Sequence, residues 1–206
     1  VIVINSTIRS MKYNGGVVKE EINQENLEAL KVGINNLKTH ILNMQKSTKN
    51  IVVCLNKFNN DTDKEINYVK NFCQDLGCRF AISTSYVEGG KGSINLAKEV
   101  IDLCNKDVDY KPLYDFSEPI ITKIEKVCQE IYHAKEVIIS DKALEKINLL
   151  NKNNFANLPI CIAKTQYSLT DNPKILGNPK DFTMTVTDIR LASGAGFIVV
   201  LMGSIM

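Results

Sequence analysis

Short apolar runs alternate with amphipathic stretches in the first half of the chain. Three of the runs are brief and rich in β-branched or aromatic residues, which is typical of buried strands: Val1 to Asn5, Ile51 to Leu55 and Arg79 to Ser83. Other stretches place apolar residues three and four positions apart and predict helices: Asn23 to about Ser47, Asp61 or Thr62 to about Leu76, and Ser93 to Cys104. Strands that alternate with helices indicate parallel βαβ units. We therefore expect an α/β domain over about residues 1–110.

The pattern changes in a polar stretch from Asp107 to Asp115, which contains Pro112 and is the best candidate for a domain boundary. Beyond it the pattern predicts helices over residues 118–132 and from Ser140 or Asp141 to about 150, and strands over 136–139, 158–163, 182–188 and 197–201. Three prolines and a glycine predict an irregular loop over 170–181. This indicates a smaller α+β domain over 111–206, and the apolar run before Met206 suggests that this domain is truncated at its C-terminus.

Composition narrows the class of protein without naming a function. Hydrophobic residues make up 44% and charged residues 23% of the chain, which is the usual balance of a globular protein. A formal charge of +2 gives no electrostatic case for nucleic acid or an anionic membrane as partner. No stretch reaches the roughly 18 apolar residues that a membrane span needs.

The cysteines and histidines give little support for a metal site. No two of the six cysteines form a C-x-x-C pair, so we interpret them as reduced, mostly buried thiols of an intracellular protein. His40 and His133 are the only histidines, and two structural or surface histidines are the simpler interpretation. We expect no metal ligands in this chain.

Polar segments follow the predicted strands, where open α/β sheets place their ligand loops. The first runs from Thr7 to Gly16, and its cations Arg9 and Lys12 suit an anion, although a solvated basic turn would explain them equally well. The second, Leu55 to Asn59, is reminiscent of the guanine-reading N-K-x-D loop of GTPases, but Asn59 replaces the aspartate. Phe58 in this loop could stack on a flat heterocycle or could pack at the edge of the core.

Two further segments carry candidate chemistry. Residues 83–93 end in a glycine-rich turn before a helix and would favour an anion, but the spacing is not a Walker A pattern and a flexible turn is an alternative. Residues 161–173 crowd polar side chains at the end of a strand, and periodicity alone does not say what they bind.

Taken together and in order, these segments resemble formate–tetrahydrofolate ligase over essentially the whole chain. N-S-T-I-R-S-M-K-Y-N-G-G at residues 5–16 resembles the family signature V-A-T-I-R-A-L-K-x-H-G-G. L-N-K-F-N-N-D-T at 55–62 is similar to N-x-F-x-T-D-T, and Y-V-E-G-G-K-G at 86–92 is similar to W-A-x-G-G-x-G. P-I-C-I-A-K-T-Q-Y-S-L-T-D-N-P at 159–173 and D-I-R-L-A-S-G-A-G-F-I at 188–198 resemble two further family blocks.

The resemblance implies an ATP-dependent ligase that uses Mg²⁺ and makes 10-formyltetrahydrofolate from formate and tetrahydrofolate through formyl phosphate. It also implies a P-loop-NTPase-like fold for the first domain and a homo-oligomeric, cytoplasmic parent protein, with a mitochondrial location left open. It assigns roles to residues that match the family pattern. These are pterin stacking for Phe58 and Tyr86, the anionic end of the site and catalysis for Arg9 and Lys12, a folate-pocket wall for Glu88, Gly89 and Gly90, and support of the site for Lys164, Thr165 and Gln166.

The departures from the family pattern leave alternatives open. Tyr86 replaces the tryptophan of the stacking pair, and Asn14 replaces a histidine and does not titrate. The G-E-G-K-[ST] P-loop of the family would lie before Val1, and a Met-Pro-Gly-Leu-Pro run would follow Met206, so we expect this chain alone to be inactive. A non-catalytic folate-binding or scaffold module and a GTPase-like nucleotide-binding domain are the two alternatives.

Overall fold

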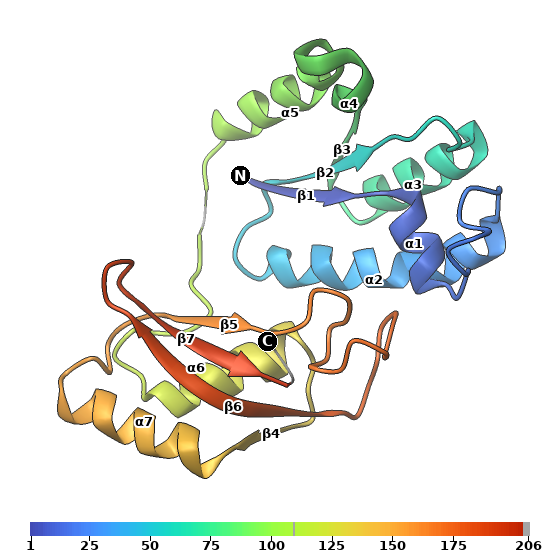
Figure 1. The fold of residues 1–206 in the computed structure, drawn as a ribbon. Coiled ribbons are helices and arrows are strands. Elements are labelled where there is room, and N and C mark those ends of the chain that lie inside the picture. The colour runs from blue at the N-terminus through green and yellow to red at the C-terminus, as the bar shows by residue number, and fades with distance from the viewer. Residues whose placement is uncertain (109, 204–206) are drawn as a thin grey trace. The chain divides into compact units, whose positions relative to one another are not determined.

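The computed structural model describes residues 1–108 and 110–203, and the chain divides into two compact units, Val1–Lys111 and Pro112–Met206. The expected boundary was after residue 110. Each unit has its own sheet and its own core (Figure 1).

The first unit is built on a parallel three-stranded sheet, as the alternation of strands and helices predicted. Its strands are β1 (Ile2–Ser6), β2 (Ile51–Asn56) and β3 (Arg79–Ser83), in the order β1-β2-β3. The register pairs Ser6 with Leu55 and Asn56 with Ser83, so all three strands end at the same edge of the sheet. Five α-helices and a 3₁₀ turn accompany the sheet: α1 (Ile8–Asn14), α2 (Leu27–Gln45), α3 (Asp63–Asp75), α4 (Ser85–Glu88), η1 (Gly89–Ser93) and α5 (Ile94–Cys104).

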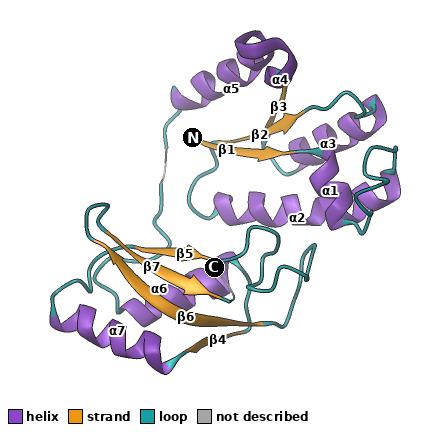
Figure 2. Ribbon diagram, in the orientation of Figure 1, coloured by secondary structure: helices purple, strands orange, loops and turns teal. Residues whose placement is uncertain are grey.

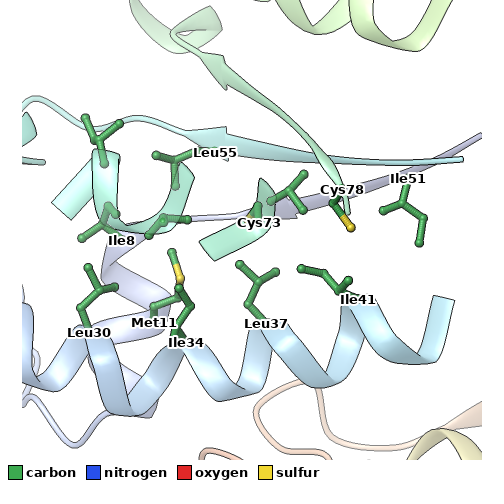
Figure 3. Packing of buried hydrophobic residues seen from close by; sticks show 13 residues of the cluster. Ile8, Met11, Leu30, Ile34, Leu37, Ile41, Ile51, Leu55, Cys73 and Cys78 are labelled. Carbon is green, nitrogen blue, oxygen red and sulfur yellow. The ribbon is translucent and has the colours of Figure 1, made fainter. Parts of the chain in front are cut away.

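The main core of this unit lies between the sheet and helices α2 and α3. Alternate residues of β2 enter it, among them Val53 and Leu55, and α2 presents a stripe that includes Leu30, Ile34 and Leu37 (Figure 3). Fully burying one such side chain contributes about 1.5–3 kcal/mol. Helix α5 covers the opposite face through a smaller cluster, so the central strand is enclosed on both sides.

Helix α1 was not predicted, because the segment from Thr7 to Gly16 was interpreted as a polar ligand segment with a loop at Tyr13 to Gly16. The structure shows a capping box in which the Thr7 hydroxyl accepts from the Ser10 amide at 2.9 Å, while the Ser10 hydroxyl accepts from the Thr7 amide at 3.3 Å. Ile8 and Met11, three positions apart, bury one face of this short helix against α2. Gly33 allows the two helices to touch, since a Cβ there would lie 1.7 Å from the Met11 carbonyl oxygen. Tertiary packing therefore decides the conformation of this segment.

The second unit contains a mixed four-stranded sheet. Its strands are β4 (Glu136–Ile139), β5 (Ile160–Ala163), β6 (Thr183–Ala192) and β7 (Phe197–Met202), in the order β4-β6-β7-β5. Only the pair β6 and β7 is antiparallel. Helix α6 (Ile120–Lys126), which continues as a π-helical turn η2 (Val127–Ile131), and helix α7 (Asp141–Lys152) pack on one face of the sheet (Figure 2).

No helix within the described residues is both long and apolar enough to cross a membrane.

Candidate functional site

The polar segments of the first unit meet at the carboxyl edge of its sheet. Residues after β1 form α1, residues after β2 form the turn that carries Phe58, and residues after β3 form α4 and the glycine-rich turn. The Lys57 amide donates to the Ser83 carbonyl at 2.9 Å, which joins the second and third of these segments. This is the edge at which parallel α/β sheets bind ligands.

A tight turn holds Phe58 at this edge. The Asp61 carboxylate accepts from the Phe58 amide at 2.8 Å, and the Asp61 amide donates back to the Phe58 carbonyl at 3.1 Å. Asp61 is buried, and burial raises the pKa of its carboxyl group despite the hydrogen bond from Phe58 and the positive charges of Lys12 and Arg9. The turn thus fixes the backbone from which the half-buried Phe58 ring projects.

A pocket of about 360 Å³ lies beside this ring, and both polar and apolar side chains line it. The residues that line it come from the second and third segments: Lys57, Phe58, Asn59, Thr84, Val87 and Glu88. The Glu88 carboxylate accepts a hydrogen bond from the Thr84 hydroxyl one helical turn before it. The pocket therefore offers an aromatic surface, a cation, an amide and a carboxylate to a ligand.

Tyr86 does not line this pocket. Its side chain is 93% exposed, and the neighbouring Val87 faces the pocket instead. The segments that carry Phe58 and Tyr86 follow two adjacent strands, but only the Phe58 ring lines the pocket. Stacking by Tyr86 stays a prediction.

The glycine-rich turn after Tyr86 owes its shape to two of its glycines. Gly89 has a φ of +59°, which other residues rarely adopt, and a Cβ on Gly92 would lie 2.5 Å from the backbone of Thr84. The Thr84 amide donates to the Gly92 carbonyl at 3.1 Å, which closes the turn. Gly90 has open space around its Cα, so nothing in the structure requires glycine there.

Arg9 lies against Phe58. Its guanidinium carbon is 4.0 Å from the centroid of the Phe58 ring, within the range of a cation–π contact. Among the described residues, the Arg9 Nε is buried and has no hydrogen-bond partner. The sequence predicts Arg9 at the anionic end of a site, whereas in the structure it contacts the Phe58 ring and does not line the pocket.

Lys12 occupies a different environment from the one expected. Its side chain is 1% exposed, and its ammonium group lies 3.1 Å from the carboxylate of the fully buried Glu65. It also donates to the Gln24 carbonyl at 2.7 Å. The Glu65 carboxylate in turn accepts from the amides of Asn26 at 3.1 Å and Thr62 at 3.3 Å, the residues that cap α2 and α3. Lys12 thus holds three helix ends together, and its ammonium group is shielded from solvent.

In the second unit, Lys164 organises the loop after β5. Its ammonium group donates to the carbonyls of Thr165 at 3.2 Å and Thr170 at 3.1 Å and to that of Ser168, and it lies 4.7 Å from the centroid of the Tyr132 ring. Burial lowers the pKa of Lys164 to about 8, while the negative charge of Asp171 opposes this shift. These contacts hold the loop in place, and support of a folate site by Lys164 stays a prediction.

The other two residues of this predicted group differ in exposure. The Thr165 hydroxyl accepts from the Tyr167 amide at 3.3 Å, and the Gln166 side chain is exposed. Both lie in the loop that Lys164 holds, and their support of a folate site stays a prediction.

The arrangement of polar segments at a parallel sheet edge is shared by many unrelated enzymes, and comparison with known families decides between them. A family model described as formate–tetrahydrofolate ligase matches residues 1–206. The chain belongs to the formate–tetrahydrofolate ligase family. Its Asn56-Lys57 pair is therefore part of a ligase segment, which argues against the GTPase-like alternative.

Two curated relatives carry the same family name. The chain is 48% identical over 206 residues to the formate–tetrahydrofolate ligase of Campylobacter concisus (strain 13826), covering 100% of this chain and 38% of the relative. It is 45% identical over 204 residues to that of Petrotoga mobilis (strain DSM 10674 / SJ95), covering 99% and 37% respectively. The chain therefore spans less than half the length of the curated relatives that it matches.

Several residues of the site were not identified by their resemblance to the ligase blocks. Glu65 had a sequence signal in the capping-box spacing from Thr62, but its buried pairing with Lys12 had none. The sequence pattern indicates Asp61 only as a helix start, although its carboxylate holds the Phe58 turn. No sequence signal indicates Val87 as a residue that lines the pocket.

Proposed function

We propose that this chain is part of an ATP-dependent ligase that joins formate to tetrahydrofolate, and that it supplies one wall of the folate site. Family membership over the whole chain supports the ligase assignment. The single observation that carries the folate site is the aromatic ring of Phe58 in a pocket at the carboxyl edge of a parallel sheet.

The pocket suits the pterin end of tetrahydrofolate in both shape and chemistry. A volume of about 360 Å³ accommodates a bicyclic ring, and the Phe58 ring offers it a flat apolar surface. The carboxylate of Glu88 can accept hydrogen bonds from the ring N–H and amino group of a pterin, and Lys57 can donate to its carbonyl oxygen. Glu88, Gly89 and Gly90 would then form the wall expected from the sequence.

The proposed reaction has two steps with different requirements. Formate attacks the γ-phosphate of ATP, which gives formyl phosphate and releases ADP. N10 of tetrahydrofolate then attacks the formyl carbon, expels phosphate and loses its proton. A weak amine and a reactive anhydride must be aligned away from water in the second step. Phe58 and the turn held by Asp61 would orient the folate for that attack.

The residues of this chain do not fit a site for ATP and Mg²⁺. In the described part of the chain, no group of three or more His, Cys, Asp or Glu side chains could hold a metal ion. None of the 206 residues begins a G-x-x-x-x-G-K-[ST] pattern. We therefore propose a role for this chain in the folate half of the reaction and derive no phosphoryl-transfer step from it.

A non-catalytic folate-binding module is the second candidate. The exposure of Tyr86 and the presence of Asn14 where the family has histidine favour it. Both candidates require Phe58 to contact the folate, and they differ in whether the bound folate is formylated. A folate-binding module would bind tetrahydrofolate and leave formyl phosphate unreacted.

Calorimetry under anaerobic conditions tests the folate site directly. Tetrahydrofolate is titrated into the wild-type chain, Phe58→Ala and the control Phe116→Ala, which removes an exposed phenylalanine from the second unit. Loss of the stacking contact is expected to weaken binding by about 5- to 150-fold in Phe58→Ala alone, from about 1–3 kcal/mol per stacked base-like ring. Equal affinity of the wild type and Phe58→Ala would refute the proposed site.

A further inference from the structure

The Phe58 ring contacts a positive charge that does not line the pocket. The guanidinium carbon of Arg9 lies 4.0 Å from the ring centroid, and Arg9 is not among the residues that line the pocket, whereas Phe58 is. We infer that Arg9 is a positioning residue that acts through Phe58 and makes the pocket face of that ring selective for a reduced pterin. This inference rests on the proposed function of the pocket as a folate site.

The surroundings of Arg9 favour this role over a structural ion pair. Its Nε is buried and has no hydrogen-bond partner in the described residues, so the contact with the ring compensates part of the cost of burying the group. The Asp61 carboxylate senses the charge of Arg9, and it already accepts a hydrogen bond from the Phe58 amide. Arg9, Asp61 and Phe58 thus form one assembly. Arg9 contacts the ring of Phe58, and Asp61 holds its backbone.

A cation on one face of an aromatic ring changes what the other face prefers. The charge draws π-electron density toward itself, so the opposite face becomes less negative and stacks better on an electron-rich partner. A tetrahydropterin carries amino groups and saturated ring nitrogens that donate electrons into its pyrimidinone, whereas an oxidised pterin is electron-poor. With Arg9 against its ring, Phe58 should therefore bind tetrahydrofolate more tightly than folate. The difference in affinity should exceed what stacking area alone would give.

A double-mutant cycle between the two residues tests the inference. Anaerobic calorimetry with tetrahydrofolate and with folate is performed on the wild type, Arg9→Gln, Arg9→Lys, Phe58→Ala and the double variant Arg9→Gln/Phe58→Ala. Arg9→Gln is expected to weaken tetrahydrofolate binding by about 2- to 10-fold, which is the range of the specific part of an aromatic stacking contact. It should weaken folate binding less, Arg9→Lys should restore part of the loss, and Arg9→Gln should cause no further loss when Phe58 is already alanine.

The control for charge is Lys98→Gln, which removes an exposed cation from α5. It should leave the ratio of the two affinities unchanged. Additive losses in the double variant, or an equal loss for tetrahydrofolate and folate, would overturn the inference. So would weakened binding of inorganic phosphate by Arg9→Gln with tetrahydrofolate binding intact, because Arg9 would then be an anion ligand.

A measurement without ligand separates failure of this inference from failure of the folate site. The ring resonances of ¹³C-labelled Phe58 should shift in Arg9→Gln and shift less in Arg9→Lys, with backbone resonances of β2 unchanged. Unshifted ring resonances would refute the contact whatever the chain binds. Shifted ring resonances with equal tetrahydrofolate affinity in the wild type and Phe58→Ala would refute the folate site, and with it the preference for a reduced pterin.

Discussion

Removing the charge of Lys12 should destabilise the first unit more than any loss of a surface ion pair. Lys12 and Glu65 are 1% and 0% exposed, so Lys12→Met leaves a carboxylate that water cannot reach. Breaking one partner of a buried pair costs about 3–5 kcal/mol. Two backbone amides still donate to Glu65 in this variant, at 3.1 and 3.3 Å, which places the expected loss near the lower limit, at about 3 kcal/mol.

The partner substitution Glu65→Gln should cost more. The Lys12 ammonium would keep the Gln24 carbonyl at 2.7 Å as an acceptor but would lose the carboxylate, and the expected loss is about 4 kcal/mol. The double variant Lys12→Met/Glu65→Gln leaves no buried charge, so it should cost clearly less than the two single losses added together.

Urea unfolding followed by circular dichroism measures these losses. With an m-value of about 1–3 kcal/mol/M, a loss of about 3 kcal/mol lowers the midpoint by roughly 1–3 M. Hydrogen exchange of peptides from residues 1–111 assigns the change to the first unit, because the two units need not unfold together. The matched control is Lys31→Met, whose ion pair with Glu28 is exposed, so solvent screening leaves it little effect on stability.

Two results would refute this reasoning. Equal losses in Lys12→Met and Lys31→Met would show that the buried pair stabilises no more than the exposed one. Additive losses in the double variant would show that the two side chains do not interact, despite the 3.1 Å between their charged atoms.

Three further predictions concern other parts of the chain. Gly33→Ala should lower the free energy of unfolding by about 1–3 kcal/mol in urea, because its Cβ would lie 1.7 Å from a carbonyl oxygen of α1, whereas Gly90→Ala should change it by less than about 0.5 kcal/mol. Burial lowers the pKa of Lys164 from its ordinary 10.5 to about 8, so the folded chain binds fewer protons than the unfolded chain between these values. Stability of the wild type relative to Lys164→Met should therefore rise with pH through that window, and urea titrations at its two ends check the sign. A thiol reagent should label the exposed Cys104 and Cys161 in the folded chain and the four buried thiols only on unfolding, with mass spectrometry as the readout.

The hydrophobic pattern predicted most of the elements because most of them bury one regular face. The strand from Arg79 to Ser83 and the short strand from Glu136 to Ile139 have the bounds that the sequence indicated. The helix beginning at Asp63 starts one residue after a predicted cap and is followed by Gly77, whose φ is +74°. In such elements, local propensity and tertiary burial agree.

The sequence carried no recognisable signal for segments whose conformation depends on long-range contacts. The helix from Ile8 to Asn14 is short and is followed by two glycines. Its stability comes from packing on a helix that begins more than a dozen residues later. Arg9 and Lys12 lie three positions apart on that helix and reach different partners, Phe58 and Glu65, more than 45 positions along the chain. A single sequence gives the types of these residues but not the pairing between them.

Tyr86 lies in one of the predicted site segments, but its side chain does not line the pocket. Successive residues of a helix point about 100° apart, so the turn of α4 that directs Val87 into the pocket directs Tyr86 away from it. A sandwich of Phe58 and Tyr86 around a pterin therefore requires α4 to rotate or unwind. This helix has four residues and no side-chain hydrogen bond at its N-cap, and Gly89, with a positive φ, follows it. Its length of a single turn makes such a rotation less costly than movement of the Phe58 turn, which Asp61 holds from both ends.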